Sequence, residues 1–152
     1  MDLTNRYILM CQKALEIQDL WRPKQCDIII EQEMIEAGLS FCKQGASEVQ
    51  VVNLYYDEGT EQYQQECEEL RNIAVWLPRQ DQLQYIIEPD ESKVCLIIHH
   101  VLSDKYYYSP KDTYIEPHKV FYSMEQLWLA YVLKAKYNKI WNEEDWVTGK
   151  SD

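Results

Sequence analysis

The side chains best suited to chemistry are one cysteine and three histidines in the second half of the chain: Cys95, His99, His100 and His118. Thiolate sulfur and imidazole nitrogen are common zinc ligands, and a cysteine with a histidine can also act as a nucleophilic pair. Residues 94–102 are apolar on both alternating faces, which predicts a strand covered on both sides. On such a strand Cys95 and His99 share one face, whereas His100 lies on the other.

The spacing argues against direct catalysis by this group. Cys95 and His99 are four residues apart, so on a strand they are separated by about 13 Å at roughly 3.3 Å per residue, too far for proton transfer. A metal ion would need further ligands from elsewhere, and a buried cysteine with hydrogen-bonded histidines is the simpler interpretation. We therefore predict no catalytic residue, no metal and no cofactor. A small hydrolase or metal-dependent enzyme built on these four residues is the alternative.

Other signatures of enzymes are missing from the sequence. It contains no glycine-rich phosphate loop, no GxSxG elbow and no HExxH helix, and it has only four glycines. A non-enzymatic role in protein interaction or self-association is the function that this pattern favours.

Tyrosines supply the predicted contact surface. The chain has twelve, and a group of them lies close in sequence with lysines between, a mixture typical of protein interfaces. Nearby aspartates and a glutamate cancel those lysines, which disfavours a stacking platform for single-stranded nucleic acid. Half-buried tyrosines on an edge hairpin are the structural alternative. The predicted partner-binding residues are Tyr106, Tyr107, Tyr108 and Tyr114.

Composition and charge limit the partners. The chain has 152 residues, with 26 acidic and 15 basic side chains, a formal net charge of −11 and a pI near 4.7. Such a field repels phosphate backbones, so we expect a protein partner or a homo-oligomer and no nucleic acid. Five cysteines without a CxxC pair indicate reduced thiols and a cytoplasmic location. No apolar run approaches the roughly 20 residues of a membrane span, so no membrane association is expected.

Residues 57–69 form a strongly acidic segment without lysine or arginine. This composition predicts a flexible insert, either a solvated loop or a fraying surface helix. A functional interpretation is that the segment attracts a basic partner.

The elements expected around these residues alternate between helix and strand. Apolar residues at helical spacing predict one opening helix over residues 3–21, and Ser123 with Gln126 predicts the capped start of a final helix that ends at Asn138. The expected buried stripe of that helix comprises Met124, Leu127, Trp128, Tyr131, Val132 and Ala135. A short helix is predicted over 80–87, and strands over 27–30, 49–56, 73–76 and 94–102. The predicted fold class is an α/β (α+β) sandwich. It is one domain over 1–152, with a small mixed sheet of three to five strands, an N-terminal helix, a C-terminal helix and a short middle helix.

Several short motifs together resemble a known family. They are Asn5-Arg6-Tyr7, Trp21-x-Pro23, Trp76-Leu77-Pro78-Arg79-Gln80-Asp81-Gln82-Leu83, Gln126-Leu127-Trp128-Leu129-Ala130, Lys136-Tyr137 and Trp141. The combination is similar to small bacterial prophage-encoded proteins carrying the phage α-β-α (ABA) sandwich domain, and it spans most of the chain. The resemblance implies a compact sandwich fold and an origin in a mobile element, and it transfers no catalytic residue. Residues 57–69 and 103–118 depart from the pattern.

Overall fold

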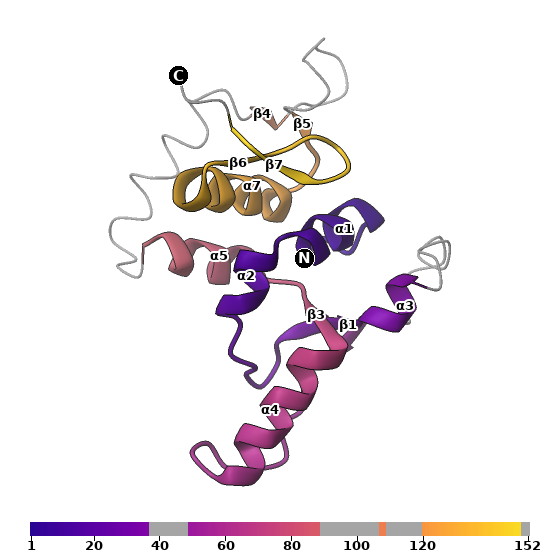
Figure 1. The fold of residues 1–152 in the computed structure, drawn as a ribbon, viewed down its shortest axis with the longest axis vertical. Helices are drawn as coiled ribbons and strands as arrows, with labels where there is room; N and C mark the ends of the chain where they lie inside the picture. Colours follow the sequence, from indigo (N-terminus) through magenta and orange to yellow (C-terminus); the bar gives the residue numbers. More distant parts are fainter. Residues whose placement is uncertain (37–48, 89–106, 109–119, 150–152) are drawn as a thin grey trace. The chain divides into compact units, whose positions relative to one another are not determined.

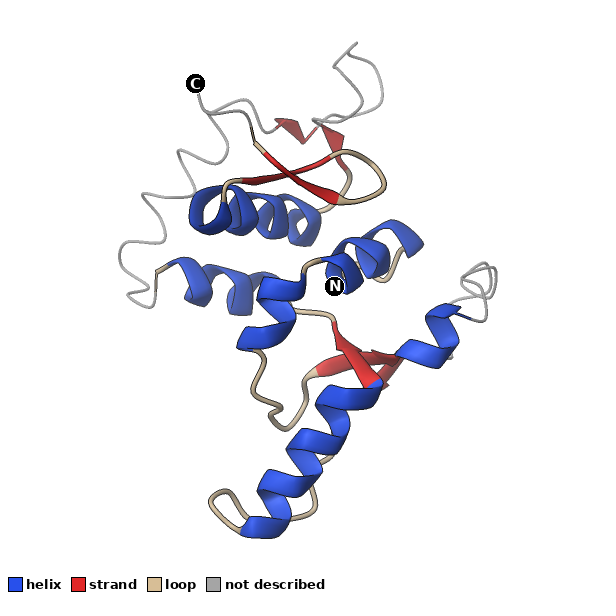
Figure 2. Ribbon diagram, in the orientation of Figure 1, coloured by secondary structure: helices blue, strands red, loops and turns tan. Residues whose placement is uncertain are grey.

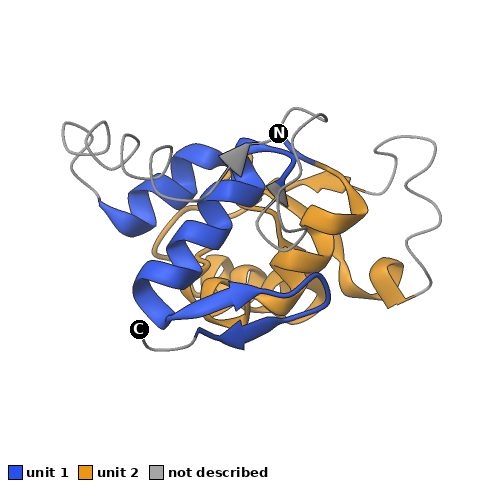
Figure 3. Ribbon diagram, turned by 90° about the horizontal axis from the view of Figure 1, so that it is seen from above, with its two compact units in different colours: residues 1–2, 79–152 blue, residues 3–78 orange. Residues whose placement is uncertain are grey.

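The protein has a mixed α+β architecture, as predicted (Figure 1, Figure 2). The computed structural model describes residues 1–36, 49–88, 107–108 and 120–149. These fall into two compact units: residues 3–78 form one, and residues 1–2 with 79–152 form the other (Figure 3). The single domain over 1–152 stays a prediction, and each unit is described separately. The predicted strand over 94–102 lies outside the described residues.

The unit of residues 3–78 is built on a small antiparallel sheet. Its strands are β1 (Ile28–Glu31), β2 (Val49–Val51) and β3 (Ala74–Trp76), in the order β2-β1-β3. Ile29 of β1 lies opposite Gln50 of β2 and Trp76 of β3. The described strands thus include the predicted ones near residues 28, 49 and 74, but β2 ends five residues earlier than expected.

The predicted opening helix is two helices, α1 (Asn5–Lys13) and α2 (Leu15–Leu20). Ala14 interrupts them with φ −85° and ψ 63°, and its N–H donates to the carbonyl of Cys11. The expectation of one continuous helix is therefore wrong. Thr4 caps α1 by accepting a hydrogen bond from the Tyr7 N–H.

The apolar stripe that predicts these helices is nevertheless buried at every position except Leu3, which is half-buried and lies before α1. The buried members are Tyr7, Met10, Ala14, Ile17 and Trp21. The Trp21 ring stacks on Trp76 of β3, with centroids 6.2 Å apart and an interplanar angle of 6°. The Trp21 indole N–H also donates to the buried Asp27 carboxylate at 2.9 Å, which fixes the chain just before β1.

A side chain closes the free edge of β3. The Gln18 amide on α2 accepts a hydrogen bond from the Trp76 backbone N–H (2.9 Å) and donates to the Trp76 carbonyl (3.0 Å). It also donates to the Cys11 carbonyl at 3.0 Å. The amide thus takes the place that a peptide group of a fourth strand would occupy.

Replacing Gln18 with leucine should therefore reopen that edge. Leucine has nearly the same volume but leaves the buried N–H and carbonyl of Trp76 unpaired, so we expect a loss of about 2–4 kcal/mol in the free energy of unfolding. Urea unfolding followed by circular dichroism measures this loss. Gln18→Glu keeps the acceptor but places a carboxylate oxygen against the carbonyls of Trp76 and Cys11, so near pH 7 its loss should be at least as large. A loss below about 1 kcal/mol in Gln18→Leu would contradict the role assigned to the amide.

Two further helices complete this unit. The short α3 (Gln32–Glu36) follows β1 directly and packs against it. The helix α4 (Glu61–Ile73) precedes β3. Of the acidic segment 57–69, residues 61–69 lie in this surface helix and residues 57–60 lie in the turn before it. No residue of α4 is fully buried.

The second unit is centred on α7 (Met124–Tyr137). The Ser123 hydroxyl accepts from the Gln126 N–H as predicted, and Asn138 ends the helix in the left-handed conformation with φ 51°. The one-sided stripe was wrong in part: Ala135 is exposed, whereas Leu129, Ala130 and Leu133 are buried as well. α7 is thus buried on most of its sides.

The neighbours of α7 explain this burial. The short helix α5 (Gln80–Ile87) packs along it, with the predicted bounds. The hairpin of β6 (Lys139–Trp141) and β7 (Trp146–Thr148) folds back onto it and buries both tryptophans. Arg79 and Asp81 form an ion pair at the start of α5.

The first residues of the chain belong to this second unit. The buried Asp2 carboxylate accepts hydrogen bonds from the Ser123 hydroxyl and from the Gln126 amide (2.7 Å) at the start of α7. A carboxylate at that position also faces the positive end of the helix dipole.

Candidate functional site

The sequence-predicted site residues lie mostly outside the described residues. This holds for Tyr106, Tyr114 and the whole group of Cys95, His99, His100 and His118. The backbones of Tyr107 and Tyr108 form β4 (Tyr107–Tyr108), which pairs in parallel with β5 (Val120–Phe121). Tyr107 lies opposite Val120, and Tyr108 lies opposite Phe121.

Searching the described residues for a metal site gives a negative result. Among them, no three histidine, cysteine, aspartate or glutamate side chains are grouped to hold an ion. Similarly, no helix in the described part of the chain is long and apolar enough to cross a membrane.

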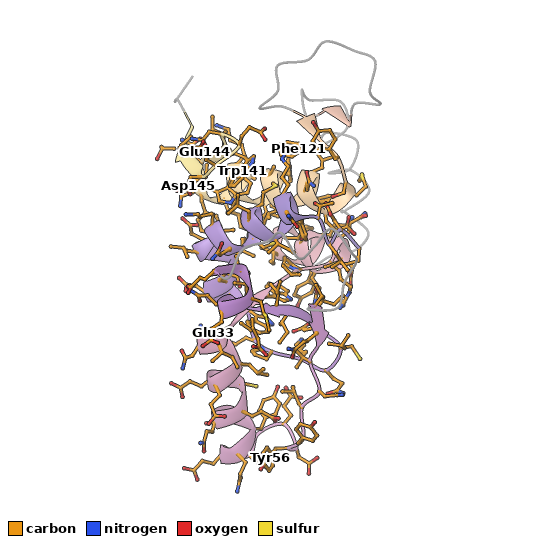
Figure 4. The ribbon with its side chains drawn as sticks, turned by 90° about the vertical axis from the view of Figure 1, so that its right-hand side faces the viewer. Glu33, Tyr56, Phe121, Trp141, Glu144 and Asp145 are labelled. Carbon is orange, nitrogen blue, oxygen red and sulfur yellow. The ribbon has the colours of Figure 1, made fainter. Side chains whose placement is uncertain are left out.

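The described part of the chain does contain an exposed tyrosine pair that sequence analysis missed. Tyr55 and Tyr56 are 84 % and 53 % exposed, in the loop between β2 and α4. Figure 4 labels Tyr56. We had predicted a strand through Tyr56, but β2 ends at Val51. Two adjacent tyrosines followed by Asp57, Glu58 and Gly59 were the available signal, because that composition favours a turn over a strand.

Hydrogen bonds on both sides hold this loop in place. The Tyr55 backbone N–H donates to both oxygens of the Glu66 carboxylate on α4, at 3.2 and 3.3 Å. The Leu54 N–H donates to the Gln25 side chain at 2.8 Å. The two aromatic rings are therefore presented by an ordered backbone, which reduces the entropy lost when a partner binds.

The start of α4 is fixed in the same way. Thr60 caps the helix by accepting from the Tyr63 N–H, and its hydroxyl donates to the Asp57 carbonyl at 2.8 Å. Gly59 has φ +93°, a conformation that glycine adopts without strain. The turn from Tyr56 to Thr60 is thus a defined structure.

Carboxylates follow the tyrosine pair in the sequence and along α4. Residues 55–69 contain six of them and no lysine or arginine: Asp57, Glu58, Glu61, Glu66, Glu68 and Glu69. All except Glu66 are exposed. In the part of the chain that the structure describes, no ion pair joins them to a basic side chain. We call Tyr55, Tyr56 and these six carboxylates the acidic tyrosine face.

The inner side of α4 anchors the face to the rest of its unit. Half-buried Tyr63 and Cys67 both approach the Pro23 carbonyl, the tyrosine hydroxyl at 3.3 Å. Burial, then a hydrogen bond with Cys67, then the negative charges of Glu58 and Asp27 among others, raise the pKa of the Tyr63 hydroxyl above its usual 10.0.

The chain was also compared with known proteins. No protein-family model, no curated protein and no solved structure matches it.

Proposed function

We propose that this protein is a non-enzymatic interaction module and that its contact surface includes the acidic tyrosine face. The observation that carries the proposal is Tyr55, whose side chain is 84 % exposed while its backbone N–H is held by Glu66. The backbone that carries this exposed aromatic ring is already ordered, so little conformational entropy is lost when a partner binds over the ring. Tyrosine supplies contact area at low entropic cost, which is why it is enriched in binding surfaces.

The wider assignment rests on sequence. The resemblance to phage α-β-α sandwich proteins supports a prophage-type origin, and the odd number of cysteines without a CxxC pair supports a cytoplasmic location. The second proposed contact surface is the group Tyr106, Tyr107, Tyr108 and Tyr114. Its proposed partner is a second copy of the chain.

A photo-crosslinking amino acid placed at position 56 tests the proposal. When the protein is expressed in a bacterial host and irradiated, we expect a defined covalent adduct with one protein, identified by mass spectrometry. Adding Tyr55→Ser should reduce its yield about tenfold. The matched control places the same crosslinker at Tyr85, which is 67 % exposed on α5 and outside the face. Equal adducts from both positions, or none from position 56, would contradict the proposal.

A further inference from the structure

Taking the acidic tyrosine face as the contact surface, we propose that its occupant is a lysine- or arginine-rich segment of a different protein. This inference rests on the proposed function and adds the chemistry of the partner. The six carboxylates of residues 57–69, a stretch without lysine or arginine, attract cations, and each copy of the chain carries a net charge of −11. Two copies would therefore repel each other at this face, and nucleic acid would be repelled as well.

The aromatic rings add a requirement beyond charge. A guanidinium or ammonium group stacks favourably on an exposed tyrosine ring, and the alkyl stem of the same side chain covers the apolar part of the ring. Glu66 holds the backbone of Tyr55, and Glu69 lies three residues further along α4, hence on the same side of the helix. A cation on the Tyr55 ring would thus also meet carboxylates.

The other unit offers a natural comparison. Glu143, Glu144 and Asp145 form a second exposed group of carboxylates in the β6–β7 loop (Figure 4). The tryptophans beside it, Trp141 and Trp146, are only 2 % and 6 % exposed. That loop therefore presents negative charge without an accessible ring of its own, whereas the acidic tyrosine face presents both.

The experiment measures binding of a fluorescently labelled peptide of ten arginines to the full chain by anisotropy at low salt. The triple variant Asp57→Asn, Glu58→Gln, Glu69→Gln should weaken binding about tenfold, since it removes three charges near the tyrosine pair and leaves Glu66 in place. The matched triple Glu143→Gln, Glu144→Gln, Asp145→Asn removes the same charge from the other loop. We expect it to change the dissociation constant by less than about twofold.

The contribution of the rings is measured separately. Tyr55→Ser with Tyr56→Ser should weaken peptide binding about tenfold, the effect of two exposed cation–π contacts, while Tyr85→Ser should leave it unchanged. Circular dichroism spectra matching that of the parent protein confirm that each variant is folded. Equal weakening by both charge triples would show that binding follows net charge alone and would overturn the inference, as would an unchanged affinity in the tyrosine double variant.

Failure of this inference can be told apart from failure of the proposed function. At about 0.5 M salt, interactions between exposed charges are screened. If the crosslinker at position 56 captures a partner and the yield of the adduct does not change at this salt concentration, the protein is still an interaction module, but the proposal of a cationic occupant is wrong. A covalent dimer of the chain as the only adduct would make a second copy the occupant. No adduct at all would remove the proposed function itself.

Discussion

Replacing Trp21 with alanine is expected to lower the free energy of unfolding by about 4–6 kcal/mol, the largest single loss in residues 3–78. The change removes a buried ring stacked on Trp76, and cavities of this kind cost about 3–5 kcal/mol. It also removes the indole N–H that donates to the buried Asp27 carboxylate. Losing this hydrogen bond costs about 1–3 kcal/mol, part of which is already counted in the cost of the cavity.

Urea unfolding gives the size of this loss, and amide hydrogen exchange gives its location. Exchange should increase across β1 and β3 first, because Trp21 and Asp27 join α2 to the sheet. Trp21→Phe is the matched control: it keeps an aromatic ring against Trp76 and loses only the N–H donor. If Trp21→Phe were as unstable as Trp21→Ala, the stacking would not carry the energy that we assign to it.

Trp128→Ala should cost about 3–5 kcal/mol in the other unit. Trp128 is completely buried in the middle of α7, so the sequence-based prediction of its burial is confirmed. Its indole N–H has no hydrogen-bond partner among the described residues. Trp128→Phe removes that unpaired donor, which is favourable, and only part of the buried side-chain volume, which is unfavourable. The two effects offset each other, so the loss in the free energy of unfolding should be much smaller than in Trp128→Ala.

The same measurements separate the variants by unit. Trp128→Ala should increase exchange along α7 and α5, whereas Trp21→Ala should act on the sheet of residues 3–78. An unchanged melting temperature in Trp128→Ala would contradict the packing described for α7. A single transition that shifts equally in both variants would support the predicted single domain.

The elements with local signals were predicted well. The bounds of α5 followed from Pro78 before it and from its short apolar stripe, and Asn138 marked the end of α7 because asparagine tolerates the left-handed conformation. The Gln82 side chain accepts from the Arg79 N–H, three residues away, an interaction that short-range sequence patterns encode.

Features that depend on distant residues were missed. Alanine is the strongest helix former, so nothing near Ala14 predicts a break between α1 and α2. Gln18 looks like an ordinary helical glutamine, and its partner Trp76 is 58 residues away. The exposed pair Tyr55 and Tyr56 was assigned to a strand because tyrosine has high strand propensity, although the turn composition of Asp57, Glu58 and Gly59 follows it directly.

The contacts of Asp2 have a consequence for synthesis. Its partners Ser123 and Gln126 follow it by 121 and 124 positions, whereas residues 3–78 contain every strand of their own sheet. At roughly 5–20 residues per second, a ribosome adds Gln126 about 6–25 seconds after Asp2. The sheet of residues 3–78 can form during that interval, while Asp2 has no access to these two partners. Completion of the start of α7 therefore depends on a residue that was added 121 to 124 positions earlier.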